Sequence, residues 1–280
     1  MKFADVTSSP SWVIIQLLEA CNLRCRMCYE WGETGAYHEL AQLATLDLEL
    51  VLRTVRECLP RKPAFEFFGG EPMLYPGIWD VIREIRAGGC DLAFPTNGTL
   101  LEVNAQQLVD NGPTRLWVSL DGPAPVNDLQ RGRGVFKRVM RGLQALAAAR
   151  AAKGSRYPEL GVTYVVTPSN CDHIESFFLN DIDLSLLSCV SIELQSFATR
   201  DEATRYGNDL KKHFGVANTP CASAFVRDPD IFAGMDAVEV TRQLRRVSEA
   251  CDERGILFHS QPQTLETSNV QNYLRANWQQ

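Results

Sequence analysis

Short apolar strands alternate with helical segments from about residue 12 to residue 214, and this alternation constrains the fold more than any other feature. The expected strands are 12–18, 64–68, 91–94, 115–120, 160–166 and 190–197. The expected helices are about 46–59, 78–87, 103–111, 136–152, 174–179 and 201–214, with Thr45 as the N-cap of the first. A helix after each strand implies parallel pairing with right-handed crossovers. The pattern predicts an α/β barrel or partial barrel. Six repeats are too few for the complete eight-fold barrel.

Cys21, Cys25 and Cys28 place three thiols within eight residues, directly after the strand 12–18. A loop leaving a strand end can bring three sulfurs to one centre, and thiolate is a preferred ligand of iron–sulfur clusters and of zinc. A structural zinc site normally has a fourth protein ligand, and here the nearest is His38, ten residues on. The spacing alone leaves an iron–sulfur site, a zinc site and three buried cysteines open.

The ends of the next strands have motifs of their own. They are Gly69-Gly70-Glu71-Pro72, Thr96-Asn97-Gly98-Thr99-Leu100 and Ser119-Leu120-Asp121-Gly122, with Arg131 to Phe136 behind the last. Function in such folds collects at the C-terminal ends of the strands, so these motifs and the cysteines are expected to share one pocket. The bland alternatives are a tight turn for the glycine pair, helix caps for Asn97 and Thr99, and a solvated surface residue for Arg131.

Taken in this order, the five motifs resemble those of the radical S-adenosylmethionine (radical SAM) superfamily. The motifs span residues 21–136, and the strand–helix pattern extends the similarity to about residue 200. The resemblance implies a partial (β/α)6 TIM-like barrel, open at one side, over residues 11–215. Residues 216–280 are then a short C-terminal extension or the start of a truncated auxiliary domain. The core is similar to SPASM and twitch-type members, but the cysteine-rich extension of those proteins is absent, since only Cys221 and Cys251 lie in this region.

The resemblance also implies the roles of single residues. Cys21, Cys25 and Cys28 would ligate three irons of a [4Fe-4S] cluster, whose fourth iron binds S-adenosylmethionine. The remaining cofactor contacts are expected from Gly69, Gly70, Glu71 and Pro72 at the methionine amino group, Ser119 and Asp121 at the ribose, Thr96 and Asn97 on the same side, and Arg131 at the carboxylate. Met27 departs from the family, which often has an aromatic residue before the third cysteine.

The implied function is a radical SAM enzyme of the oxidoreductase or transferase type. It would cleave S-adenosylmethionine reductively to a 5′-deoxyadenosyl radical and abstract hydrogen from a peptide or small-metabolite substrate. An external one-electron donor such as flavodoxin or ferredoxin would reduce the cluster, and no further catalytic residue is assigned. Residues 31–37 are the expected substrate entrance. Two alternatives stay open: a metal- or cluster-bearing binding scaffold without radical chemistry, and methyl transfer without a radical.

Composition restricts partners and compartment. A net charge of −6 argues against nucleic-acid binding, which needs concentrated Lys and Arg. The sequence shows no signal peptide and no apolar run of about 18 residues, so we expect a cytoplasmic protein without membrane contact. Its nine cysteines should then be thiols or metal ligands. Core packing is expected for Cys58, Cys90 and Cys189, and a buried thiol is favoured for Cys221.

Overall fold

The computed structural model describes residues 10–38, 40–216 and 219–277. Within them, seven strands form one sheet in chain order. The strands are β1 (Trp12–Leu18), β2 (Ala64–Gly69), β3 (Leu92–Thr96), β4 (Arg115–Ser119), β5 (Glu159–Val166), β6 (Cys189–Leu194) and β7 (Leu257–Gln261). Strands β1 to β4 pair in parallel, and so do β5 to β7. The α/β class is therefore confirmed, with one strand more than the six repeats predicted.

The additional strand is β7, which lies in the region predicted as a C-terminal extension. It pairs with β6 in parallel, with His259 opposite Ser191 and Gln261 opposite Glu193. Residue contacts divide the chain into two compact units. Unit 1 comprises residues 1–22, 42–118 and 138–160, and unit 2 comprises residues 23–41, 119–137 and 161–280. The proposed domains, 11–215 and 216–280, stay a prediction.

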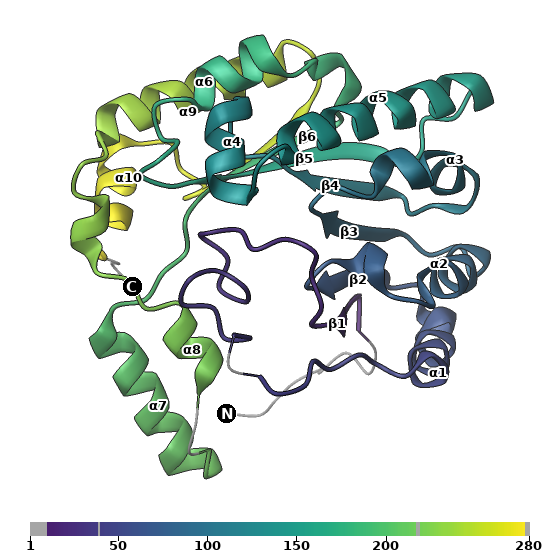
Figure 1. The fold of residues 1–280 in the computed structure, drawn as a ribbon, viewed down its shortest axis with the longest axis horizontal. Helices are drawn as coiled ribbons and strands as arrows, with labels where there is room; N and C mark the ends of the chain where they lie inside the picture. The colour runs from purple at the N-terminus through teal and green to yellow at the C-terminus, as the bar shows by residue number, and fades with distance from the viewer. Residues whose placement is uncertain (1–9, 39, 217–218, 278–280) are drawn as a thin grey trace. The chain divides into compact units, whose positions relative to one another are not determined.

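Unit 1 alternates its strands with helices whose apolar residues recur every three or four positions. Figure 1 shows α1 (Leu48–Cys58), α2 (Ile78–Ala87) and α3 (Leu101–Asn111) along one side of this unit. Most of α5 (Val135–Lys153) also belongs to it. The buried stripe of α2 consists of Ile78, Val81, Ile82 and Ile85. Such a stripe packs onto the apolar side of the strands, which is why these segments were correctly predicted as helices.

The first helix begins two residues later than predicted, and Thr45 is not its N-cap. The cap is Asp47, whose side chain accepts a hydrogen bond from Leu50 N at 3.0 Å. Thr45 instead forms an isolated antiparallel bridge with Leu18, and Leu46 N donates to Leu17 O at 2.9 Å. Pairing with the end of β1 therefore keeps this stretch extended up to the cap.

Unit 2 contains the remaining helices. They are α4 (Ala124–Arg131), α6 (Ile174–Ser176), α7 (Arg200–Phe214), α8 (Pro220–Ala224), α9 (Ala237–Asp252) and α10 (Thr267–Leu274). A π-helical turn, η3 (Phe177–Asp181), continues α6. The sequence analysis predicted neither α4 nor α8, which contain Pro125 and Pro220, respectively. Both prolines lie in the first turn of their helix, where the missing N–H has no intrahelical partner in any case.

The remaining short elements are single 3-10 turns, and no helix of the described residues is both long and apolar enough to span a membrane. The turns are η1 (Leu59–Arg61), η2 (Pro72–Leu74), η4 (Leu184–Leu186) and η5 (Pro229–Phe232).

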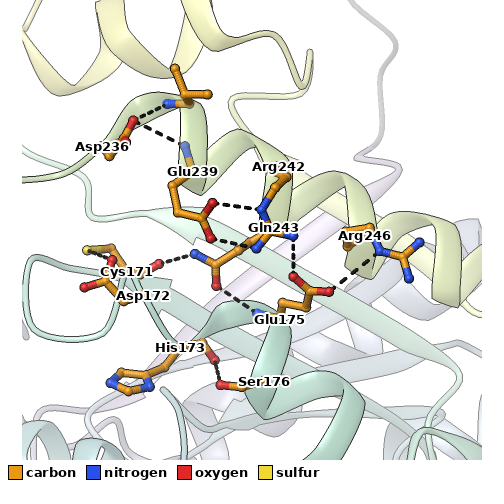
Figure 2. Close-up of polar contacts among 11 residues, drawn as sticks. Cys171, Asp172, His173, Glu175, Ser176, Asp236, Glu239, Arg242, Gln243 and Arg246 are labelled. Atoms are coloured by element: carbon orange, nitrogen blue, oxygen red, sulfur yellow. Dashed lines mark hydrogen bonds and ion pairs between the residues drawn. The ribbon is translucent and has the colours of Figure 1, made fainter.

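Helix α9 is joined to α6 and to the loop before it by a buried amide. Gln243 Nε2 donates to Cys171 O at 2.9 Å, and Gln243 Oε1 accepts from Glu175 N at 3.1 Å, as Figure 2 shows. Arg242 and Arg246 surround the Glu175 carboxylate at 2.6 and 3.7 Å. These ion pairs are half-exposed and contribute little, so the buried amide is the stronger connection.

The aromatic core of unit 1 gives a test of this packing. Phe67 of β2 is fully buried, with its ring 5.7 Å from that of Phe94. Phe67→Ala is expected to lower the free energy of unfolding by about 3–5 kcal/mol, because it leaves a large cavity. The matched control is Phe68→Ala, at the next position on the opposite side of the strand, where the ring is half-buried and the cost is smaller. Urea denaturation measures both, and equal costs would contradict this core.

Candidate functional site

The glycine pair after β2 packs against the chain that leaves β1. A β-carbon on Gly69 would lie 2.2 Å from Leu18 O, and one on Gly70 would lie 2.2 Å from Ala20 O. Gly70 N donates to Leu18 O and Glu71 N to Ala20 O, both at 3.0 Å. Side chains are therefore excluded here by backbone, and not only by an approaching ligand. The contact fixes the residues that immediately precede Cys21.

Glu71 connects the ends of β2 and β3. Its side chain is 1% exposed and accepts from Thr96 Oγ1 at 2.8 Å and from Asn97 N at 2.7 Å. It also caps η2 by accepting from Met73 N at 3.1 Å, beside the buried Pro72. Burial raises the pKa of this carboxyl to about 7, although the three hydrogen bonds oppose the shift. Glu71 and Thr96 thus bind each other, a contact that the sequence did not predict.

Asn97 connects Cys21 to a small hydrogen-bonded group of two amides and a hydroxyl. Asn97 Nδ2 donates to Asn22 Oδ1 at 2.7 Å and lies 3.8 Å from Cys21 Sγ. Thr99 N donates to Asn97 Oδ1 at 3.0 Å, and Asn22 Nδ2 donates to Thr99 Oγ1 at 2.9 Å. Neither Asn97 nor Thr99 is the N-cap of α3, which is Leu100 without a side-chain cap. Sequence reasoning missed Asn22, although its position next to Cys21 in the motif was a signal.

Cys25 and Cys28 lie on a tight turn of unit 2. Cys28 N donates to Cys25 O at 3.1 Å, and Trp31 N approaches Cys28 Sγ at 3.3 Å. Position 32 requires a glycine, because a β-carbon there would lie 2.4 Å from Cys28 O. Arg26 N donates to Gln130 O at 2.9 Å, which attaches the turn to α4. Hydrogen bonds within this segment and to α4 therefore hold Cys25 and Cys28 on the turn.

Asp121 and Arg131 form a buried ion pair beside Cys25. Arg131 Nε is 2.6 Å from Asp121 Oδ2, with the side chains 7% and 0% exposed. Arg131 Nη1 lies 4.0 Å from Cys25 Sγ. Burial lowers the pKa of Arg131, but the charges of Asp121 and of the Cys25 and Cys28 thiolates raise it more, so that its pKa lies above the usual value. The alternative of a solvated surface arginine is therefore wrong.

Four further buried polar residues of unit 2 were not predicted. Asp121 N donates to Asn127 Oδ1 at 3.0 Å, and Asn170 Nδ2 donates to Asp121 O at 3.0 Å. Thr167 Oγ1 donates to Gln130 Oε1 at 3.0 Å. Ser119, which is half-buried, was selected because it is the last residue of β4. Thr167 and Asn170 follow β5 directly, so the same rule, that polar residues at strand ends are site candidates, could have found them. Asn127 and Gln130 lie on the helix that the sequence did not reveal.

The predicted substrate entrance, residues 31–37, is partly a small aromatic core. Trp31 and Tyr37 are buried and meet edge to face, with ring centroids 5.7 Å apart. The Arg24 guanidinium lies 3.9 Å above the Trp31 ring. Glu33 and Thr34 are the exposed positions of this segment, and His38 directly after it is also exposed. An entrance here would therefore use the polar residues and not the aromatic ones.

The sulfurs of the motif have surroundings that suit thiolates. An N–H donor faces each of them: Asn97 Nδ2 at Cys21, Arg131 Nη1 at Cys25 and Trp31 N at Cys28. Such donors stabilise the charged sulfur that ligates metal. Asn127 Nδ2 and Gln130 Nε2 are in addition buried donors without a hydrogen-bond partner among the described residues. Within its own unit, each of these donors suits a thiolate ligand, and no group of three His, Cys, Asp or Glu that could hold a metal ion occurs in the part of the chain described.

The other cysteines behave as ordinary thiols. Cys90 and Cys189 are buried as predicted, whereas Cys58 is only half-buried. Burial raises the pKa of Cys251 to about 11, which makes it unreactive. The side chain of Cys221 lies outside the described residues, as do Trp278 to Gln280.

The raised pKa of Glu71 predicts a pH dependence of stability. Between about pH 4.5 and 7 the folded chain holds a proton that the unfolded chain releases, so stability falls as pH rises, by up to about 3 kcal/mol. Glu71→Gln should abolish this component, while the exposed control Glu57→Gln keeps it. Denaturant titrations at pH 4.5 and 8 measure the difference. An unchanged pH dependence in Glu71→Gln would show that the carboxylate is not buried.

Curated relatives match more than half of the chain. The tungsten-containing aldehyde ferredoxin oxidoreductase cofactor-modifying protein of Pyrococcus furiosus is 29% identical over 164 residues, which are 57% of this chain and 44% of the relative. The GTP 3′,8-cyclase of Trichormus variabilis is 34% identical over 166 residues, 57% of this chain and 48% of the relative. The chain thus spans about half the length of the curated relatives it matches.

Solved structures agree with the fold. Streptococcus suis SuiB bound to S-adenosylmethionine superposes with a TM-score of 0.62 at 16% identity, covering 90% of this chain and 51% of SuiB. SuiB bound to its precursor peptide SuiA gives a TM-score of 0.61 at 15% identity, covering 90% and 49%. The likeness shows the partial TIM-barrel fold that was predicted from the motifs.

The model of the radical SAM superfamily matches residues 15–172, more than half of the chain. This match includes the three motif cysteines, the glycine pair and the buried Asp121–Arg131 pair. The chain belongs to the radical SAM superfamily.

Proposed function

We propose that the chain is a radical SAM enzyme whose Cys21, Cys25 and Cys28 hold a [4Fe-4S] cluster with S-adenosylmethionine. The observation that carries the proposal is the N–H donor beside each of the three sulfurs, in a chain that matches the superfamily model over the same residues. Neither a disordered loop nor three core cysteines would need such donors. The cluster and its cofactor, when bound, supply the one-electron cleavage that yields a 5′-deoxyadenosyl radical.

The chain's own residues position and shield this chemistry. Backbone carbonyls near Gly69 and Gly70 are the proposed acceptors for the methionine amino group, because the Glu71 carboxylate is already occupied by Thr96 and Asn97. Ser119, half-buried at the end of β4, is the proposed contact of the ribose. Asp121 has no exposed surface, so its contribution is to hold Arg131. Arg131 stays our candidate for the cofactor carboxylate, since guanidinium binds carboxylate strongly.

The proposed substrate is a peptide or a small metabolite, and the proposed electron donor is a flavodoxin or ferredoxin. The precursor peptide bound to SuiB supports the first substrate class, and the GTP for which the cyclase relative is named supports the second. Extracts of producing cells grown in deuterated medium, divided by size into peptide and metabolite fractions, can decide between them. The fraction that transfers deuterium into 5′-deoxyadenosine contains the substrate.

Loss of single cysteines tests the proposed cluster. Anaerobic reconstitution with iron and sulfide should give about four irons per chain and, with dithionite and S-adenosylmethionine, 5′-deoxyadenosine. Cys25→Ala should lose most of the iron and all nucleoside product. The control is Cys58→Ala, which removes a half-buried thiol of α1 outside the motif and should keep both.

The scaffold alternative makes the opposite prediction for the same samples. Tight zinc binding by the unsubstituted chain, with no 5′-deoxyadenosine under any reducing condition, would favour a metal-bearing binding module. Methyl transfer without a radical would instead give S-adenosylhomocysteine from a chain that needs no iron.

A further inference from the structure

Unit 2 holds a guanidinium against the sulfur of one motif cysteine. Arg131 Nη1 lies 4.0 Å from Cys25 Sγ, and the arginine side chain is almost fully buried. Charges shielded from water interact more strongly and are screened less by salt than surface charges. The backbone keeps the two groups together, because Arg26 N donates to Gln130 O, one residue from each. The Cys25 sulfur therefore faces a fixed positive charge.

Asp121 holds the other part of this guanidinium. Its Oδ2 contacts Nε at 2.6 Å as an ion pair and not as an aligned hydrogen bond. Its Oδ1 accepts from Val165 N at 2.9 Å, and its backbone N–H and C=O bond to Asn127 and Asn170. The sulfur therefore meets Nη1 of the guanidinium, and the carboxylate meets Nε of the same group. The cation is the charged group in direct contact with the sulfur.

We propose that the Asp121–Arg131 pair sets the reduction potential of a cluster ligated by Cys25, with Arg131 raising the potential and Asp121 lowering it. This inference rests on the proposed function, because it needs the cluster. One-electron reduction adds negative charge to the cluster, so a nearby cation stabilises the reduced form and a nearby anion opposes it. Asp121 is thus a positioning residue that fixes the arginine and moderates its effect.

Potentiometric titration of the reconstituted protein, followed by electron paramagnetic resonance without S-adenosylmethionine, tests the proposal. Omitting the cofactor separates tuning of the cluster from binding of the cofactor carboxylate. Arg131→Gln should lower the ratio of reduced to oxidised cluster roughly tenfold at the unsubstituted protein's midpoint, a downward shift of about 59 mV for one electron. Asp121→Asn, which keeps the arginine charge, should shift the midpoint upward. Opposite signs identify an electrostatic effect, because a loosened loop would shift both variants the same way.

The matched control is Arg133→Gln, which removes the same charge from an exposed position two residues away and should leave the midpoint unchanged. If Arg131→Gln does not fold over an unpaired Asp121, the double variant Asp121→Asn/Arg131→Gln replaces it, since its two amides leave no buried charge. The double variant should have a lower midpoint than Asp121→Asn alone.

Equal midpoints in this comparison, or shifts of the same sign in the two single variants, would overturn the inference while the proposed function stands. Loss of the cluster from all of these variants would overturn it too, because the pair would then be required for binding and not for tuning. An unsubstituted protein that binds no cluster contradicts the proposed function itself.

Discussion

Burial of a carboxylate at the end of a parallel strand is the costly interaction around which each unit is organised. A buried charge is tolerated only where donors or an opposite charge surround it. In unit 1, Glu71 is surrounded by three donors from η2 and from the end of β3. In unit 2, Asp121 meets Arg131 and a backbone N–H of β5. Glu71 thereby fixes Asn97, which lies beside Cys21. Asp121 fixes Arg131, which lies beside Cys25.

The surroundings of the two carboxylates differ in whether they place a charge near a motif cysteine. Glu71 has no compensating cation among the residues that the structure describes, so its pKa rises to about 7 and its role is to hold neighbouring strand ends together. Asp121 retains its partner cation, and that cation extends to the Cys25 sulfur. Glu71 is therefore a structural link, whereas the Asp121–Arg131 pair places an electrostatic field at the proposed cluster site.

Elements with a strong hydrophobic periodicity could be predicted from the sequence. Contacts between residues that are distant in the sequence could not. The apolar stripe of α2 and the position of the motifs at strand ends followed from spacing. The N-cap at Asp47 did not, because the pairing of Thr45 with Leu18 is a tertiary contact. Likewise, Asp121 and Arg131 were both singled out as cofactor contacts, but nothing in their spacing of ten residues indicated that they bind each other. Asn127 and Gln130 were missed because the helix that contains them, α4, was not predicted.

The close approach of Gly70 to Ala20 O has a consequence for how such motifs are used diagnostically. Even a single methyl group at this position collides with main-chain atoms, so the glycine is obligatory for the architecture whether or not a nucleotide ever binds. A descendant that had lost its catalytic role would still retain the pair for steric reasons. Catalytic competence in a distant homologue is therefore better judged from the groups around the sulfurs than from these glycines.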